Sequence, residues 1–135
     1  MNYKKRVWSD VEDGEAQELL VREELMKKLH LNKLVKTGKY DCFDFRSERG
    51  FVEFRTRNCK STTYPTTMLP IAKIKFANKV EEECIIVIRF TDKMMFWNVP
   101  KDYKCEAQVG GRNDRGRCEY KKKYIYLQVS ELCDF

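Results

Sequence analysis

The sequence has little of what zinc proteins, membrane proteins and secreted proteins need. It contains one histidine, His30, and none of its six cysteines lies close enough to another to form a C-x-x-C pair, so a zinc site is not expected. It has no apolar run long enough to cross a bilayer, and its start, MNYKKRVWSDVEDGE, lacks the hydrophobic segment of a signal peptide. We therefore expect an intracellular protein that is not secreted, with reduced thiols and no membrane partner.

The composition is that of a folded, basic protein. A chain of 135 residues suits a single domain, residues 1–135, with one modest core, and a hydrophobic content of 42% with 36% charged residues argues against disorder. The formal net charge is +6. Such a charge permits a polyanionic partner without identifying one.

The hydrophobic pattern predicts two helices and several strands. The first helix should run from about residue 11 or 15 to residue 31, where apolar residues recur at helical spacing. The second should be capped by Thr66 or Thr67, after Pro65, and should run to about Asn78. Strands are expected near 32–38, on both sides of a turn within 40–60, and at 83–90, 94–99 and 124–129. The run at 83–90 is apolar enough to be a strand covered on both faces. This order predicts an α/β (α+β) fold with a mixed sheet flanked by helices.

Two acids lie inside apolar strands in the stretch from Tyr40 to Lys60. Asp44 precedes the turn signal Ser-Glu-Arg-Gly, and Glu53 follows it, so a hairpin can bring the two carboxylates together. A carboxylate in a half-buried strand needs a partner. Arg55 lies two residues beyond Glu53 and therefore projects from the same face of the strand. The layout is that of a divalent-metal site with a cation beside it. The alternative is that Asp44 and Glu53 pair with arginines 46, 55 or 57 across the sheet, and the residues by themselves favour that alternative.

The segment from Asp44 to Glu53-Phe54-Arg55 resembles the core motif of the PD-(D/E)XK nucleases. Three further segments resemble parts of the same family, and together they cover most of the chain: Gly14-x-x-x-Glu18 with Val21 and Leu25; Tyr64-Pro65-Thr66-Thr67-Met68 with Lys73-Ile74; and Gly110-Gly111-Arg112-Asn113-Asp114-Arg115-Gly116. The chain differs from the family pattern at two positions. Arg55 stands where the family has lysine, and Arg117 stands where the last motif has aspartate.

The resemblance implies a restriction-endonuclease-like core and a set of site residues. It implies Mg²⁺ (or Mn²⁺) held by the carboxylates of Asp44 and Glu53 and by the carbonyl of Phe54, with Glu18 completing or orienting the shell. For the catalytic cation three options stay open. Arg55 acts in place of the family's lysine, Lys73 supplies the charge instead, or the site is degenerate and the fold only binds DNA.

The function that the resemblance implies is a metal-dependent DNA endonuclease of a virus or phage, acting in the cytoplasm of the host cell. The alternative is a non-catalytic nucleic-acid-binding or virion-associated module on the same fold. DNA is the expected partner, and a homodimer is an open option. The residues expected to contact DNA, rather than only to form a solvated surface, are Arg57, Asn58, Lys60, Tyr64, Arg112, Arg115 and Arg117.

Overall fold

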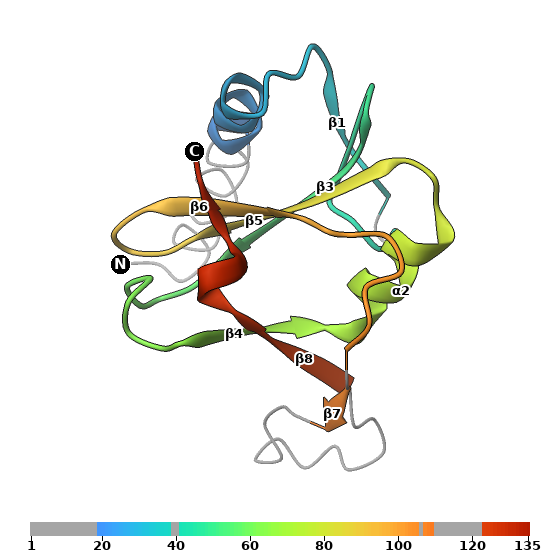
Figure 1. Cartoon of the computed structure of the whole chain (residues 1–135). Helices are drawn as coiled ribbons and strands as arrows, with labels where there is room; N and C mark the ends of the chain where they lie inside the picture. Colours follow the sequence, from blue (N-terminus) through green and yellow to red (C-terminus); the bar gives the residue numbers. More distant parts are fainter. Residues whose placement is uncertain (1–18, 39–40, 106, 110–122) are drawn as a thin grey trace, which may run out of the picture.

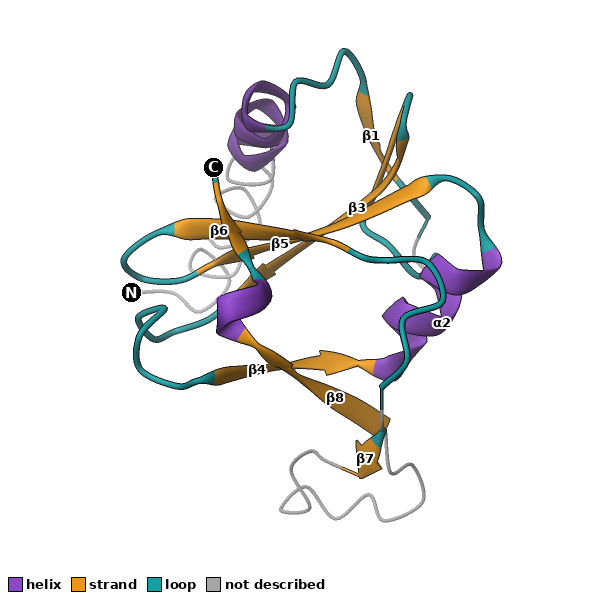
Figure 2. Cartoon of the chain, viewed as in Figure 1, coloured by secondary structure: helices purple, strands orange, loops and turns teal. Residues whose placement is uncertain are grey.

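The computed structural model describes residues 19–38, 41–105, 107–109 and 123–135 of the chain (Figure 1). A helix at 19–28 comes first and is followed mostly by strands (Figure 2). The elements after it are β1 (Leu34–Lys36), β2 (Phe45–Ser47), β3 (Gly50–Thr56), β4 (Thr66–Pro70), α2 (Ile71–Lys79), β5 (Glu83–Arg89), β6 (Met94–Asn98), β7 (Gln108–Val109), β8 (Lys123–Gln128), a 3-10 turn (Val129–Glu131) and β9 (Cys133–Asp134).

The main sheet has six strands in the order β1-β2-β3-β5-β6-β9. It is mixed, because β3 and β5 run parallel while the other neighbours run antiparallel. The predicted hairpin is confirmed: β2 and β3 pair with Phe45 opposite Val52. In β5, the five residues from Cys84 to Ile88 are all buried, as expected for a strand covered on both faces.

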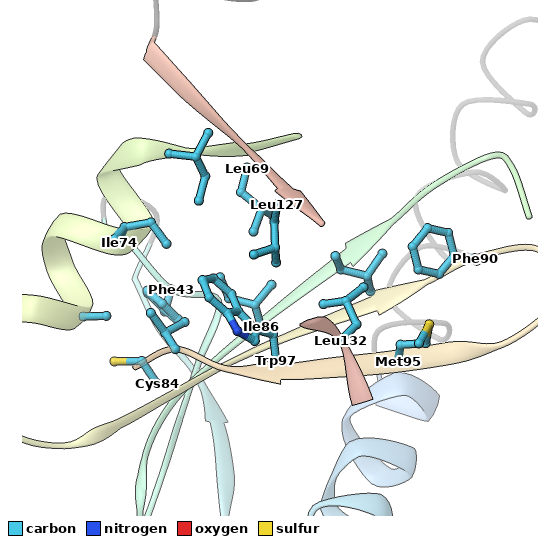
Figure 3. Packing of buried hydrophobic residues seen from close by; sticks show 14 residues of the cluster. Phe43, Leu69, Ile74, Cys84, Ile86, Phe90, Met95, Trp97, Leu127 and Leu132 are labelled. Atoms are coloured by element: carbon cyan, nitrogen blue, oxygen red, sulfur yellow. The ribbon is translucent and has the colours of Figure 1, made fainter. Parts of the chain in front are cut away.

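Different layers cover the two faces of the main sheet. On one face Ile85 and Val87 of β5 pack with Leu25 of the N-terminal helix and with Leu29, which follows that helix. The other face, which includes Ile86, packs against α2 and a second sheet of order β4-β8-β7 (Figure 3). Side chains in β5 alternate between the two faces, so one strand contributes to both cores. This arrangement confirms the α+β class with a mixed sheet flanked by helices.

The predicted start of the second helix is wrong. Thr66 and Thr67 do not cap a helix; they begin β4, which pairs antiparallel with β8 and alternates half-buried with buried residues. The helix starts only at Ile71, after Pro70, and it ends at Lys79. The reason is tertiary: the β-branched threonines and Leu69 alternate at a period of two, and β8 provides the strand that this segment pairs with.

Two further boundaries differ from the predictions. The first helix ends at residue 28 rather than Leu31, because His30 adopts a left-handed conformation and the N–H of Leu31 turns back to the carbonyl of Met26 at 2.8 Å. The start of this helix lies outside the described residues. The strand expected at the end of the chain, β8, is followed by the short β9 at the edge of the main sheet. No helix in the described ranges has the length and apolarity needed to cross a membrane.

Candidate active site

Glu53 is a buried acid in the middle of β3, on the face that looks toward α2. Its residue is 3% exposed. One carboxylate oxygen, Oε2, accepts from Arg55 Nη1 and contacts Lys73 Nζ, each at 3.1 Å. The other oxygen, Oε1, is buried and has no hydrogen-bond partner among the described residues. The site therefore holds a carboxylate with one oxygen fully engaged by cations and one oxygen left over.

Lys73 reaches Glu53 from the first turn of α2. Its side chain is 15% exposed, and its ammonium group also donates to the carbonyl of Cys42 and lies 5.6 Å from the centroid of the Phe43 ring. Lys73 therefore joins three segments that are distant in sequence: α2, β3 and the loop ahead of β2. The same loop carries Asp44.

Asp44 lies directly before β2, and two contacts hold it at the edge of β3. Its Oδ2 accepts from the N–H of Phe54 at 3.1 Å, beyond the point where β2 stops pairing with β3. On the other side of the loop, the N–H of Thr37 donates to the Asp44 carbonyl at 2.9 Å and the Thr37 hydroxyl donates to the Phe43 carbonyl. The loop is thus held by β3 on one side and by the residue that follows β1 on the other.

The two acids lie close enough to affect each other. Burial raises the pKa of the Glu53 carboxyl above its ordinary value, and the negative charge of Asp44 raises it further, while Lys73 acts in the opposite direction. The net effect is an upward shift. Two carboxylates that converge in a poorly solvated place are costly unless positive charge is near, and Lys73 and Arg55 provide part of that charge.

Arg55 lies on the same face of β3 as Glu53, and Arg57 directly follows the strand, but the two arginines behave differently. Arg55 is half-buried, pairs with Glu53, and has a buried Nε without a partner among the described residues. Arg57 turns to β4, where Nε donates to the Thr67 hydroxyl at 3.3 Å and Nη2 donates to the Met68 carbonyl. Burial, and next the charge of Arg55, lower the pKa of the Arg57 guanidinium.

The ion-pair alternative from the sequence is therefore present only in part. Of the three arginines considered as partners for the acids, Arg55 pairs with Glu53, Arg57 binds β4, and Arg46 stacks on the Phe51 ring at 4.8 Å. The ion pair does not use all of Glu53, because Oε1 has no partner within the described part of the chain.

Among the described residues no group of three or more His, Cys, Asp or Glu side chains could hold a metal ion. A site here would rest on two carboxylates and a backbone carbonyl, as the sequence predicts. The structure brings together Asp44, Glu53, Phe54, Arg55 and Lys73. Asn58, Lys60 and Tyr64 are exposed beyond the end of β3. The remaining predicted site residues lie outside the described residues: Glu18, Arg112, Arg115 and Arg117.

Comparison with protein families identifies the group to which the chain belongs. The family model described as "Phage putative PDDEXK endonuclease" matches residues 5–134, nearly the whole chain. The chain belongs to this PDDEXK family. Its mixed sheet with flanking helices is consistent with the restriction-endonuclease-like fold that the sequence predicted. No significant match was found among curated proteins or among solved structures.

Sequence reasoning does not find two parts of this candidate site. Lys73 donates to the carbonyl of Cys42, and the Thr37 hydroxyl, which holds the loop of Asp44, donates to the carbonyl of Phe43. Both contacts therefore depend on a backbone carbonyl. A carbonyl carries no residue-type signal, and nothing in the segment around Thr37 distinguishes it from an ordinary strand end. The Phe43 ring, which contacts Lys73, could have been found from the sequence by one feature, its position beside Asp44 in an apolar run.

Proposed function

We propose that this member of the PDDEXK family is a metal-dependent DNA endonuclease of a phage that uses Mg²⁺ or Mn²⁺. One observation carries the proposal: Oε1 of Glu53 is buried and has no partner among the described residues, in a carboxyl group that also feels the charge of Asp44. A buried, unpaired carboxylate oxygen is costly in a protein interior. A bound cation removes that cost.

The donors at this place fit a hard divalent cation. Carboxylate and carbonyl oxygens are the ligands that Mg²⁺ accepts, and it commonly takes only one or two carboxylates. Asp44 and Glu53 are the two carboxylates. The N–H and C=O of one strand residue point to the same edge, so the carbonyl of Phe54 points to the edge where its N–H binds Asp44. Asp44, Glu53 and Phe54 would hold the ion, which supplies water activation and charge neutralisation at phosphorus.

Lys73 has a position that helix stability does not explain. It lies in the first turn of α2, a turn without acidic residues, where the helix dipole disfavours positive charge by about 0.3–1 kcal/mol. Its contacts lie across the site instead, at Glu53 and at the Cys42 carbonyl. Residues that are unfavourable for local helix stability are expected at functional sites, and Lys73 is such a residue in contact with the candidate site.

Lys73 and Arg55 have distinct proposed roles. Both place positive charge beside the Glu53 carboxylate and so favour the ionised form that a metal ligand requires. Lys73 is nearly enclosed and spans the two acid-bearing segments, so we assign to it the stabilisation of negative charge that develops on the phosphate. Arg55 cannot give up its proton and acts as a fixed positive charge beside the phosphate.

The test is cleavage of plasmid DNA and of branched DNA with and without Mg²⁺ or Mn²⁺, comparing wild type with Glu53→Gln. Wild type should cleave only with the metal. Glu53→Gln keeps the shape of the side chain and should lose at least about 100-fold in rate, more than is typical for residues that merely support a ligand. Its DNA affinity should be unchanged, because removing a negative charge near phosphate does not weaken association.

A non-catalytic DNA-binding module is the second candidate, and Arg55 in place of the motif lysine favours it. The same experiment separates the two. Wild type that binds DNA but cleaves no form of it with either metal would leave the binding module as the function.

A further inference from the structure

Side chains on one face of β3 and just beyond its end lead from the candidate active site to a separate hollow. Glu53, Arg55 and Arg57 lie two residues apart on one face, so Arg57 is about 13 Å from Glu53 along the strand. The side chain of Arg57 turns to β4 and there lines a hollow of about 170 Å³. A nucleic-acid strand whose phosphate lies at Glu53 would reach this hollow within about four nucleotides at the ~3.4 Å rise of stacked bases, and within fewer if extended.

The walls of the hollow combine three kinds of chemistry. Phe90 and Met68 give apolar surface, Arg57 and Lys60 give positive charge, and Tyr64 gives an aromatic ring. Tyr64 is 62% exposed. An exposed aromatic ring within a basic groove is the usual platform on which single-stranded bases stack, and the cations beside it neutralise the backbone.

We propose that this hollow binds an unpaired pyrimidine base of the DNA strand that the site cleaves. This inference rests on the proposed function and adds to it the class of substrate. A base within a duplex has both faces stacked, so only an unpaired or extruded base can use Tyr64 as its stacking partner. The preferred substrate therefore has a single-stranded segment close to the cleaved phosphodiester.

The size of the hollow favours a pyrimidine, and Arg57 has donors for the carbonyl groups of such a base. A cavity of about 150 Å³ holds one benzene ring, so one six-membered ring fills a hollow of about 170 Å³, while part of a purine would project into solvent. Arg57 has five N–H donors. Three of the five donate to Thr67, Met68 and the Thr56 carbonyl, which leaves two. Thymine offers two carbonyl acceptors that match such donors.

The test measures binding without metal, so that its result does not depend on cleavage. Fluorescence anisotropy compares oligo-dT, oligo-dA and an abasic strand of equal length, together with a duplex, at low salt in EDTA. Wild type should bind oligo-dT more tightly than the other two single strands. Tyr64→Ala should weaken binding of oligo-dT roughly 5- to 100-fold, the effect of losing one stacked base, while leaving duplex binding unchanged.

Two variants serve as controls. Tyr64→Phe keeps the stacking ring and should restore tight binding of oligo-dT. Phe135→Ala removes another exposed aromatic residue, one that packs on Phe96 and does not line the hollow, and should leave binding unchanged. Because Tyr64 is largely exposed, its removal should not prevent folding.

Three outcomes overturn the inference. Equal affinity for oligo-dT and the abasic strand would show that only the backbone is bound. An unaffected Tyr64→Ala would exclude the stacking platform. Either result leaves the proposed nuclease intact if wild type cleaves plasmid DNA with metal. Absence of binding to every strand and to the duplex would overturn this inference, and the proposed function falls with it if wild type also cleaves no DNA with either metal.

Discussion

Glu53 connects the stability of this protein to its proposed chemistry. The residue is buried, shares one oxygen with two cations and leaves the other oxygen without a partner among the described residues. A buried ion pair is often no more stabilising than well-packed hydrophobic residues of similar volume, so stability alone does not explain the pair. A residue whose burial is unfavourable in the free protein should respond strongly to protons and to metal.

The raised pKa of Glu53 predicts a specific dependence of stability on pH. Below the ordinary value of 4.5 the carboxyl is protonated in both the folded and the unfolded protein, and its contribution is fully present. As pH rises through the window between 4.5 and the higher folded pKa, the unfolded chain releases the proton first, so stability is lost. The free energy of unfolding of wild type should therefore fall relative to that of Glu53→Gln between pH 4.5 and neutral pH, as measured by urea titration.

Added Mg²⁺ or Mn²⁺ should reverse this loss in wild type and not in Glu53→Gln, because the cation binds the ionised carboxyl. A wild type that gains stability relative to the variant as pH rises would contradict the upward pKa shift.

The separate roles proposed for Lys73 and Arg55 can be tested by substituting each residue in turn. Lys73→Met keeps the length of the side chain and removes the charge; it should lower kcat about 100-fold, the usual effect of removing one charge-stabilising donor. Arg55→Lys keeps the charge and should stay within about tenfold of wild type. Single-turnover cleavage at saturating DNA gives both rates. The opposite pattern, with little loss in Lys73→Met and a large change in Arg55→Lys, would assign the catalytic position to Arg55.

At the scale of elements, α2 is short and is held by contacts outside itself. It has nine residues, too few to be stable alone. Lys101 donates from its ammonium group to the carbonyls of Ala77 and Val80 at 2.8 and 2.9 Å, which satisfies groups at the end of the helix. Ile74 and Ala77 anchor its buried side in the core. These contacts hold Lys73 against Glu53.

The turn between β2 and β3 depends on Gly50. Its φ is +155°, and a Cβ added there would lie 2.0 Å from the carbonyl oxygen of Glu83 on the parallel neighbour β5. Gly50→Ala should therefore destabilise the protein by more than about 1 kcal/mol, because the clash is with backbone that cannot move independently. Gly38→Ala is the matched control. Its added Cβ would meet only the end of the Asp41 side chain, so a small change is expected.

Thermal and urea unfolding of both glycine variants measure this difference. Equal destabilisation by the two substitutions would contradict the close approach of β3 and β5 at Gly50.

At the scale of the whole molecule, the formal net charge of +6 predicts DNA binding that weakens steeply with salt. Each phosphate contact that releases counterions contributes about 0.9 to the slope of log affinity against log salt for a duplex and about 0.7 for a single strand. Lys60→Ala should reduce the slope by about one such contact. Lys33 lies at the other end of β3, beside Glu48 of the turn, and Lys33→Ala should leave the slope unchanged.

Anisotropy titrations between low and physiological salt give these slopes. An affinity insensitive to salt would argue against phosphate contacts. Equal effects of Lys60→Ala and Lys33→Ala on the slope would contradict the prediction that DNA binds the surface near Tyr64.

Local pattern was sufficient to predict part of this molecule. The hairpin from Asp44 to Glu53 followed from strand formers on both sides of a turn, and the common face of Glu53 and Arg55 followed from alternation along one strand. The burial of β5 on both faces followed from its unbroken apolar run. In each case the deciding interactions lie within a few residues, or depend only on how much surface is apolar.

Pairing between distant segments decided the rest. The segment at Thr66 and Thr67 is a strand because β8 lies beside it, although both are acceptable helix caps by themselves. The guanidinium of Arg57 binds β4 for the same reason. The contact of Lys73 with Glu53 exists only because β4 carries α2 across the end of the Asp44 loop. Local sequence does not determine such contacts, because their energy comes from surfaces that meet only after the chain has folded.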